Sequence, residues 1–171
     1  PCYDSELIQK IAEESGFAEN YVKEAGEYTP GGFLSSALSN RAFGPTNEDI
    51  LWEIQCRVIS ELAEKGPCVI VGRCADYVLR DDPNVALVNL FVHAPLAARI
   101  RRESARTNTT PAEAEKRIRQ VDKERAAYYN FFSSKRWGDA QAYDLCVNTD
   151  GLEISDVAKL VLRYLELRGL R

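Results

Sequence analysis

Three short apolar runs, separated by segments with helical periodicity, constrain the fold of this chain most. The runs cover residues 68–71, 85–92 and 143–148, and short continuous apolar runs are typical of strands buried on both faces of a sheet. Helical patterns cover residues 5–15, 18–25, 46–65, 95–106, 111–131 and 154–168. Strands that alternate with helices in this way predict an α/β fold around a central parallel sheet.

Three strands are few for such a sheet. The chain opens on Cys2 and Tyr3, a pair that is compatible with the end of one more strand. We therefore expect a parallel sheet whose first strand is missing from this chain.

Residues with capping properties mark the ends of two of the expected helices. Asp4 can cap the helix at 5–15, and Gly16 can end it in a left-handed conformation. Thr46 and Asp49 are spaced as a capping box at the start of the next long helix, and Gly66 is its expected stop. The same Thr-to-acid spacing recurs before the helix at 111–131.

Length and composition predict one domain, residues 1–171. No apolar run approaches the ~18–20 residues that cross a membrane, and no signal-peptide pattern opens the chain. The five cysteines form no CxxC pair, which favours reduced thiols in a cytoplasmic protein over a disulfide framework or a zinc site. A net charge of −4 argues against non-specific binding to nucleic acid. Residues 27–45 lose all periodicity, and we expect a mobile loop there.

The residues after the first apolar run have the composition of a ligand site. Gly72 and Arg73 follow the run directly, and Asp76 comes three residues later. Ligands of open α/β sheets bind at the carboxyl ends of the strands, where Gly permits close backbone approach and Arg can hold an anionic group. Asp76 could accept a hydrogen bond from a ring amino group or orient Arg73. The alternative is a glycine turn followed by an ordinary surface Arg–Asp pair.

The stretch 99–125 is basic although the chain as a whole is acidic. It holds nine of the 22 Lys and Arg residues but only five of the 26 Asp and Glu residues. Arg99, Arg102 and Arg106 share one helical face, a pattern that favours an anion site such as a phosphate site. Two basic helices joined by a short linker suggest a hinged lid, which suits phosphoryl transfer. The alternative is a solvated helix whose charge is balanced by acidic neighbours.

The second basic helix carries a further polar set. Asp122, Arg125 and Tyr129 lie on one side of it, although the first two can also form an ordinary intrahelical pair. The aromatic residues around Tyr129 are more typical of a core than of base stacking. Asp4, at the expected strand end, could face a ligand as well as cap a helix. His93 is the only histidine, and no metal-ligand spacing occurs, so we predict no metal site built by the protein.

Five segments of the chain carry a family resemblance when taken together. They are PCYDSELIQKIA, VIVGRCADYVL, LFVHAPLAARIRR, VDKERAAYYNFF and YDLCVNT. In this order they resemble the cytidylate kinase-like family, relatives of bacterial cytidylate kinase among the P-loop nucleoside monophosphate kinases. The resemblance implies a three-layer P-loop NTPase-like α/β fold with a helical lid at about 99–125. It also implies a first strand and a phosphate loop before Pro1, both absent here, so we expect an incomplete view of a longer protein.

The resemblance further implies three sets of site residues. Those near the acceptor nucleotide are Asp4, Arg73, Asp76, Asp122 and Arg125, with Arg73 on the acceptor's phosphate. Those that close on the phosphates of the donor, in the catalytic role, are Arg99, Arg102 and Arg106. Those that border the donor base are Asn148 and Thr149.

The leading prediction is an ATP- and Mg²⁺-dependent, cytidylate kinase-like phosphotransferase. Its acceptor would be a nucleoside monophosphate (CMP-like) or a similar small molecule, with no nucleic acid or membrane as partner. One alternative is a catalytically inactive regulatory protein that binds a nucleotide or a phosphometabolite. Another is an interaction module whose basic helices bind an acidic partner.

Overall fold

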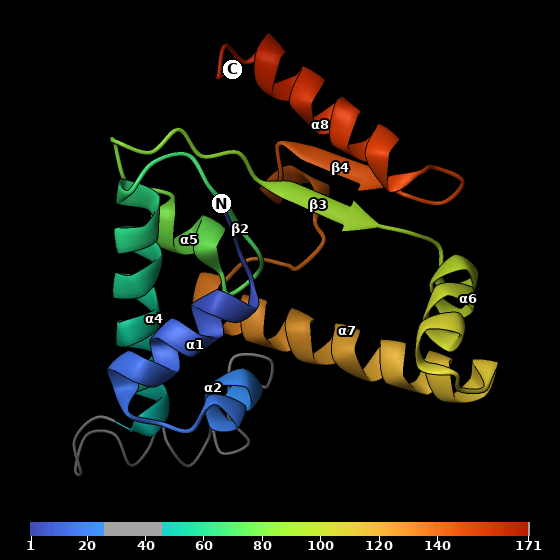
Figure 1. Cartoon of the computed structure of the whole chain (residues 1–171), viewed down its shortest axis with the longest axis horizontal. Helices are drawn as coiled ribbons and strands as arrows, with labels where there is room; N and C mark the ends of the chain where they lie inside the picture. The colour runs from blue at the N-terminus through green and yellow to red at the C-terminus, as the bar shows by residue number, and fades with distance from the viewer. Residues whose placement is uncertain (26–45, 171) are drawn as a thin grey trace. The chain divides into compact units, whose positions relative to one another are not determined.

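The computed structural model describes residues 1–25 and 46–170 (Figure 1). The predicted mobile loop at 27–45 lies outside the described residues. The chain divides into two compact units, of which the first comprises residues 1–87 and 124–137. The second comprises residues 88–123 and 138–171. A single domain over the whole chain stays a prediction.

The first unit combines a two-stranded parallel sheet with helices. Its strands are β1 (Cys2–Tyr3) and β2 (Val69–Ile70), with Cys2 opposite Val69 and Tyr3 opposite Ile70. Its helices are α1 (Ser5–Ser15), α2 (Glu19–Ala25), α4 (Asn47–Glu64) and α5 (Ala75–Leu79). The last part of α7 (Pro111–Ser133) also belongs to this unit. The expected strand end at Cys2-Tyr3 is thereby confirmed.

Apolar residues of α1 and α4 form the core of the first unit. The most deeply buried side chains are those of Leu7, Ile11, Val58, Ile59 and Leu62. They recur at intervals of three or four residues, which places them on one face of each helix. α1 and α4 accordingly pack against each other, as can be followed in Figure 1.

The helix ends agree with the sequence signals at α4 but not at the start of α1. The Thr46 hydroxyl accepts a hydrogen bond from the Asp49 amide at 3.2 Å, and the Asp49 carboxylate accepts one from the Thr46 amide at 2.9 Å, which confirms the capping box. Gly16 ends α1 with a φ of +71°, as predicted. Capping by the Asp4 side chain is wrong, because this residue makes no side-chain cap bond. Its backbone (φ −130°, ψ −86°) lies outside the extended region that capping residues adopt.

The second unit contains the other parallel pair. β3 (Leu90–His93) lies beside β4 (Leu145–Asn148), with Leu90 opposite Leu145 and His93 opposite Asn148. Its helices are α6 (Leu96–Thr107), the first part of α7, the short 3-10 turn η1 (Ala140–Ala142) and α8 (Ile154–Leu167). Figure 1 shows β3 leading into α6 and β4 into α8.

Both strands of this second sheet are shorter than predicted. β3 begins at Leu90 rather than at residue 85, and β4 begins at Leu145 rather than at residue 143. Just before the first residues of β3 and β4, Asn89 and Asp144 form hydrogen bonds to each other. The Asn89 amide donates to the Asp144 carboxylate at 2.8 Å, and its carbonyl accepts from the Asp144 amide at 2.9 Å.

One central sheet is not formed among the described residues, and a central sheet with strands buried on both faces stays a prediction. There, β2 and β3 each pair with a single neighbour, in separate two-stranded sheets. Ile70 packs on the core whereas Val69 is 60% exposed, because successive side chains of a strand point to opposite faces and only one face is covered. The fold is mixed α/β and mostly helical, with two small parallel sheets. The missing first strand stays a prediction.

The described residues also allow statements about membrane-spanning helices and about the cysteines. No helix among them has both the length and the apolar character needed to pass through a membrane. All five cysteines, which lie within the described ranges, are free thiols. Burial separates them: Cys74 is buried, whereas Cys2 and Cys146 are exposed.

Candidate functional site

The predicted site residues fall into two groups, one in each unit. The first unit holds Asp4, Arg73, Asp76 and Arg125. The second unit holds Arg99, Arg102, Arg106, Asp122, Asn148 and Thr149. The predicted acceptor set is therefore divided, because Asp122 belongs with the arginines of α6 rather than with Arg73.

In the first unit, the carboxyl ends of β1 and β2 meet at one edge of the small sheet. The Val71 amide donates to the Tyr3 carbonyl at 3.0 Å, which extends the parallel ladder by one step. Asp4 therefore leaves β1 level with Val71, the last residue before Gly72. This register places Asp4 and the Gly72–Arg73 turn at the same sheet edge, where open α/β proteins bind their ligands.

The turn after β2 has an unusual backbone. Gly72, Arg73 and Cys74 have φ angles of +71°, +57° and +54°. A left-handed backbone costs a residue with a side chain about 1–2 kcal/mol, because its Cβ crowds the following carbonyl. Two consecutive residues in this unfavourable conformation are stable only where neighbouring groups hold the turn. Strained residues of this kind are frequent at functional sites.

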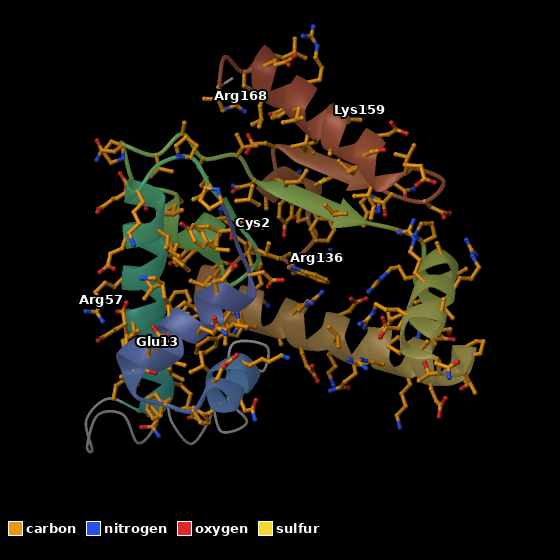
Figure 2. The ribbon with its side chains drawn as sticks, viewed as in Figure 1. Cys2, Glu13, Arg57, Arg136, Lys159 and Arg168 are labelled. Atoms are coloured by element: carbon orange, nitrogen blue, oxygen red, sulfur yellow. The ribbon has the colours of Figure 1, made fainter. Side chains whose placement is uncertain are left out.

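Gln55 holds the middle of this turn from α4. Its side-chain amide donates to the Arg73 carbonyl at 3.0 Å and to the Tyr128 hydroxyl at 3.1 Å. Gln55 and Tyr128 are only 4% and 7% exposed. Arg57, two residues further along α4, points outward instead and pairs with Glu14 at 2.9 Å (Figure 2).

The sequence reasoning did not single out Gln55, although a signal was present. Gln55 lies on the buried face of α4, four residues after Leu51 and three before Val58. A polar side chain on an otherwise apolar helical stripe needs a hydrogen-bond partner in the core. The sequence marks such a residue, but the identity of its partner requires the tertiary structure.

A second contact holds the other side of the turn. The Tyr129 hydroxyl donates to the Asp76 carboxylate at 2.6 Å. Tyr128 and Tyr129 are both buried, as the core interpretation of these aromatic residues predicted, whereas Phe131 is 40% exposed. Adjacent tyrosines of α7 thus reach the turn at two points, one through Gln55 and one through Asp76.

Burial controls the ionisation of the groups beneath the turn. It raises the pKa of the Cys74 thiol to about 12, and the Asp76 carboxylate adds to the increase. Burial also raises the pKa of the Tyr128 hydroxyl. The Arg73 guanidinium acts in the opposite direction on both groups but does not outweigh burial. Burial therefore favours the neutral form of both Cys74 and Tyr128.

In the second unit, Arg99 forms a two-pronged ion pair with Asp122. Its two terminal nitrogens donate to the two carboxylate oxygens, each at 2.7 Å. These hydrogen bonds raise the pKa of Arg99. The alternative in which Asp122 pairs with Arg125 along the helix is wrong, because the carboxylate faces α6. Arg125 is exposed.

Arg102 binds the loop that follows β4. One terminal nitrogen donates to the Thr149 hydroxyl at 2.9 Å, and the other donates to the Thr149 carbonyl at 2.6 Å. The Thr149 amide in turn donates to the His93 carbonyl at 2.8 Å, so this loop is anchored to the end of β3 as well. Arg101 lies within 3.6 Å of Asp150 in the same loop.

Arg106 has a local acidic partner. It pairs with Glu103 at 2.9 Å, and Arg117 approaches the same carboxylate at 3.5 Å. The three arginines of the predicted catalytic set thus share a helical face but have three different partners. The exposed pair of Arg106 with Glu103 fits the alternative of a solvated helix whose charge is balanced by acidic neighbours. Arg102 instead donates both of its hydrogen bonds to Thr149 in the loop after β4. Their catalytic roles stay predictions.

The described residues contain no group of three or more His, Cys, Asp or Glu side chains that could hold a metal ion. Carboxylates near the predicted site have other hydrogen-bond partners: Asp76 binds Tyr129, and Asp122 binds Arg99.

Charged residues at the carboxyl ends of short parallel strands define an α/β protein of the kind that binds ligands at a sheet edge. The chain belongs to the cytidylate kinase-like family, whose model matches residues 1–151. This confirms the family resemblance of the sequence.

Two curated relatives have low sequence identity to this chain. A cytidylate kinase of Methanopyrus kandleri is 30% identical over 154 residues, which cover 86% of this chain and 69% of that protein. A cytidylate kinase of Saccharolobus islandicus is 26% identical over 126 residues, which cover 71% of this chain. The matched part spans 63% of the length of the Saccharolobus protein.

One solved structure shows the same fold. It is the crystal structure of an uncharacterized protein from Eubacterium ventriosum, with a TM-score of 0.65 and 22% sequence identity. The match covers 94% of this chain and 89% of the other. At this identity the likeness concerns the fold alone.

Proposed function

We propose that this protein transfers the γ-phosphoryl group of ATP to a nucleoside monophosphate, with CMP as the first acceptor to test. Family membership and the names of the Methanopyrus and Saccharolobus relatives support a nucleotide kinase. The observation that carries the proposal is the held turn at Arg73, at the sheet edge that also carries Asp4. A positively charged side chain on a strained and well-anchored turn suits the binding of a phosphate monoester.

Each acceptor-side residue has a distinct role in this proposal. Arg73 binds the phosphate of the monophosphate, since a guanidinium matches two phosphate oxygens at once. Asp76 is oriented by Tyr129 and accepts a hydrogen bond from the acceptor. Asp4 contributes a carboxylate at the same edge, and the exposed Arg125 adds positive charge.

The donor-side residues lie in the second unit. Arg102 and Thr149 form a fixed corner beside Asn148, which would frame the donor base. Arg99, already paired with Asp122, and Arg106 would neutralise the phosphates of the donor. Arg106 is free to exchange Glu103 for a phosphate, because its side chain is 66% exposed and such pairs are weak.

ATP supplies the transferred phosphoryl group, and Mg²⁺ bound to its phosphates neutralises part of their charge. In this proposal the Arg102–Thr149 corner would contact the donor nucleotide, whereas the described residues contain no carboxylate cluster for the ion. Positioning and charge neutralisation by arginines account for most of the catalysis in phosphoryl transfer, so the proposal names no general base.

A coupled assay of ADP release, with CMP, UMP, AMP or GMP as acceptor, tests the proposal. We expect turnover with at least one monophosphate in the presence of Mg²⁺. Arg73→Ala should raise the KM for that acceptor by about 10- to 100-fold, because a charge-assisted hydrogen bond contributes about 1.5–3 kcal/mol. Arg102→Ala should lower kcat more than it weakens ATP binding.

Arg57→Ala is the control, because Arg57 is an exposed arginine that pairs with Glu14 away from the turn. It should leave both KM values unchanged. Turnover that neither Arg73→Ala nor Arg102→Ala alters would show that the site assignment is wrong. Monophosphate binding without turnover would favour the regulatory alternative over the kinase.

A further inference from the structure

We infer that Gln55 is a positioning residue for the acceptor, acting through the backbone of Arg73. Gln55 lies below the turn and has no direct access to a ligand, since it is 4% exposed. It would set where the Arg73 guanidinium stands and thereby the affinity for the acceptor's phosphate. This inference rests on the proposed function, in which Arg73 binds that phosphate.

The backbone of the turn needs an external constraint. Arg73 and Cys74 are both left-handed, a conformation that residues with side chains leave when nothing holds them. Within the turn, the Ala75 amide donates to the Gly72 carbonyl at 3.1 Å, which fixes its two ends. Two carbonyls lie between these ends. That of Cys74 accepts hydrogen bonds from the backbone amides of Tyr77 and Val78, each at 3.0 Å, and that of Arg73 accepts one from the Gln55 side chain.

Gln55 can bear this constraint because its own amide is fixed. The Tyr128 hydroxyl lies 3.1 Å from the amide nitrogen and 3.4 Å from the amide oxygen, so the amide contacts the hydroxyl through both of its polar atoms. Tyr128 packs with the buried Cys74 under the turn, in a cluster that includes Tyr129. The direction of the Gln55 amide is therefore set by the core, and the direction of the Arg73 carbonyl by Gln55.

Loss of the Gln55 amide has a defined consequence. The Arg73 carbonyl would lose the hydrogen bond from Gln55, so the turn would rotate to bring this carbonyl closer to water. Rotation of this peptide changes ψ of Arg73 and φ of Cys74, and the Arg73 side chain moves with the altered turn. The phosphate contact then weakens although Arg73 itself is still present.

Calorimetric titration with CMP, or with the monophosphate that the assay above identifies, tests the inference. Gln55→Leu keeps the size of the side chain but removes both polar atoms, and we expect at least tenfold weaker binding. In the Arg73→Ala background, Gln55→Leu should add less than a twofold change, because Gln55 acts through Arg73. Tyr128→Phe, a milder change that leaves the glutamine in place, should weaken binding by a smaller factor.

Val58→Ala provides the matched control for stability. Val58 is fully buried one turn along α4 and lies on the same face, but its apolar side chain cannot form a hydrogen bond to the turn. It should lower the Tm while the affinity for the monophosphate stays unchanged. If Val58→Ala weakens binding as much as Gln55→Leu does, general destabilisation explains the effect and the inference is overturned.

Two further outcomes separate this inference from the proposed function. Wild-type affinity in both Gln55→Leu and Tyr128→Phe would overturn the inference and leave the kinase proposal intact. Failure of the wild-type protein to bind any of the four monophosphates would overturn both. If Gln55→Leu does not fold, the affinity of Tyr128→Phe decides, and an unchanged value overturns the inference.

Discussion

At the scale of single residues, Cys74 shows how the turn at Arg73 is supported. It is a left-handed residue that packs its thiol among buried tyrosines, with 4% of its surface exposed. The neutral thiol suits this apolar environment, and the thiolate does not. Stability in alkaline solution therefore reports on the packing under the turn.

We expect the free energy of unfolding to fall as the pH rises above about 9. The Cys74 thiol ionises near 9.0 when unfolded but only near 12 when folded, so the unfolded state loses its proton first. The contribution of the buried Cys74 thiol to the free energy of unfolding is complete below pH 9. It is lost between pH 9 and 12, at about 1.4 kcal/mol per pH unit for one proton. Urea denaturation at a series of pH values measures this slope.

Removal of the thiol supplies the control for this pH dependence. Cys74→Ala and Cys74→Ser should both reduce the alkaline slope by about one proton, although they differ in stability at pH 7. The remaining slope is assigned to groups such as Tyr128, whose pKa burial also raises. A slope that stays the same in both variants would contradict the assigned burial of the thiol.

The ion pair of Arg99 and Asp122 shows what helical periodicity in the sequence cannot predict. Helical periodicity correctly placed Arg99 on a face with Arg102, and Asp122 on a face with Arg125. It did not show that Arg99 and Asp122 bind each other across 23 residues of sequence. Contacts between helices depend on how the helices pack, which a periodic pattern does not contain.

At the scale of elements, the two N-caps of the first unit form a natural comparison. Thr46 makes the reciprocal bonds of a capping box, whereas Asp4 makes no side-chain cap bond. Both positions carry a residue type that can cap a helix, and Thr46 has in addition the spacing of a capping box with Asp49. The Asp4 backbone (φ −130°, ψ −86°) lies outside the extended region that N-cap residues adopt, whereas that of Thr46 (φ −78°, ψ 168°) lies within it.

We expect Thr46→Ala to lower the free energy of unfolding by about 1 kcal/mol, the usual value of a lost N-cap. Asp4→Ala should have a smaller effect on stability, because no cap bond is lost. In a CMP titration the order should reverse, with weaker binding for Asp4→Ala and unchanged binding for Thr46→Ala. Equal losses of stability would contradict the assignment of the two caps.

The closing helix α8 has a narrower packed stripe than its sequence suggests. Val157, Val161 and Leu165 are partly buried, as expected for one helical face. Leu160, which lies between Val157 and Val161 in the same helix, is 44% exposed. The β3–β4 sheet contains two strands, so it offers a limited surface to the apolar residues of its unit.

At the scale of the whole molecule, the division into two units matters most for function. The turn at Arg73 belongs to the first unit, and the Arg102–Thr149 corner belongs to the second. α7 contributes residues to both, with the boundary between Lys123 and Glu124. In the proposed kinase, each unit would therefore have its own nucleotide.

Hydrogen exchange with one nucleotide at a time tests this assignment. CMP alone should slow exchange of backbone amides in the first unit, around residues 71–78. ATP alone, without acceptor, should slow exchange in the second unit, around residues 90–93 and 145–150. Bound ligands stabilise the elements they contact, so protection should follow the binding residues. Protection by CMP confined to the second unit would contradict the assignment of Arg73.

The candidate site could be predicted only in part. Arg73, Asp76 and Asp4 could be proposed because strand ends are visible as apolar runs followed by polar residues. Gln55 was missed because its partner, the Arg73 carbonyl, lies 18 residues away in sequence. Every residue has a backbone carbonyl, so the sequence does not show which one a buried side chain will bind. The five-residue helix α5 was missed because it is too short to show a helical period.

The sequence by itself determined the order of the strands and the longer helices, the parallel pairing, the capping box at Thr46 and membership in the cytidylate kinase-like family. These follow from local patterns, since periodicity, caps and motifs are properties of neighbouring residues. The tertiary structure decided the division into two sheets, the partners of Arg99 and Arg102, and the support of Arg73 by Gln55. Such contacts join residues distant in the chain, and they depend on the packing of whole elements, which no short stretch of sequence specifies.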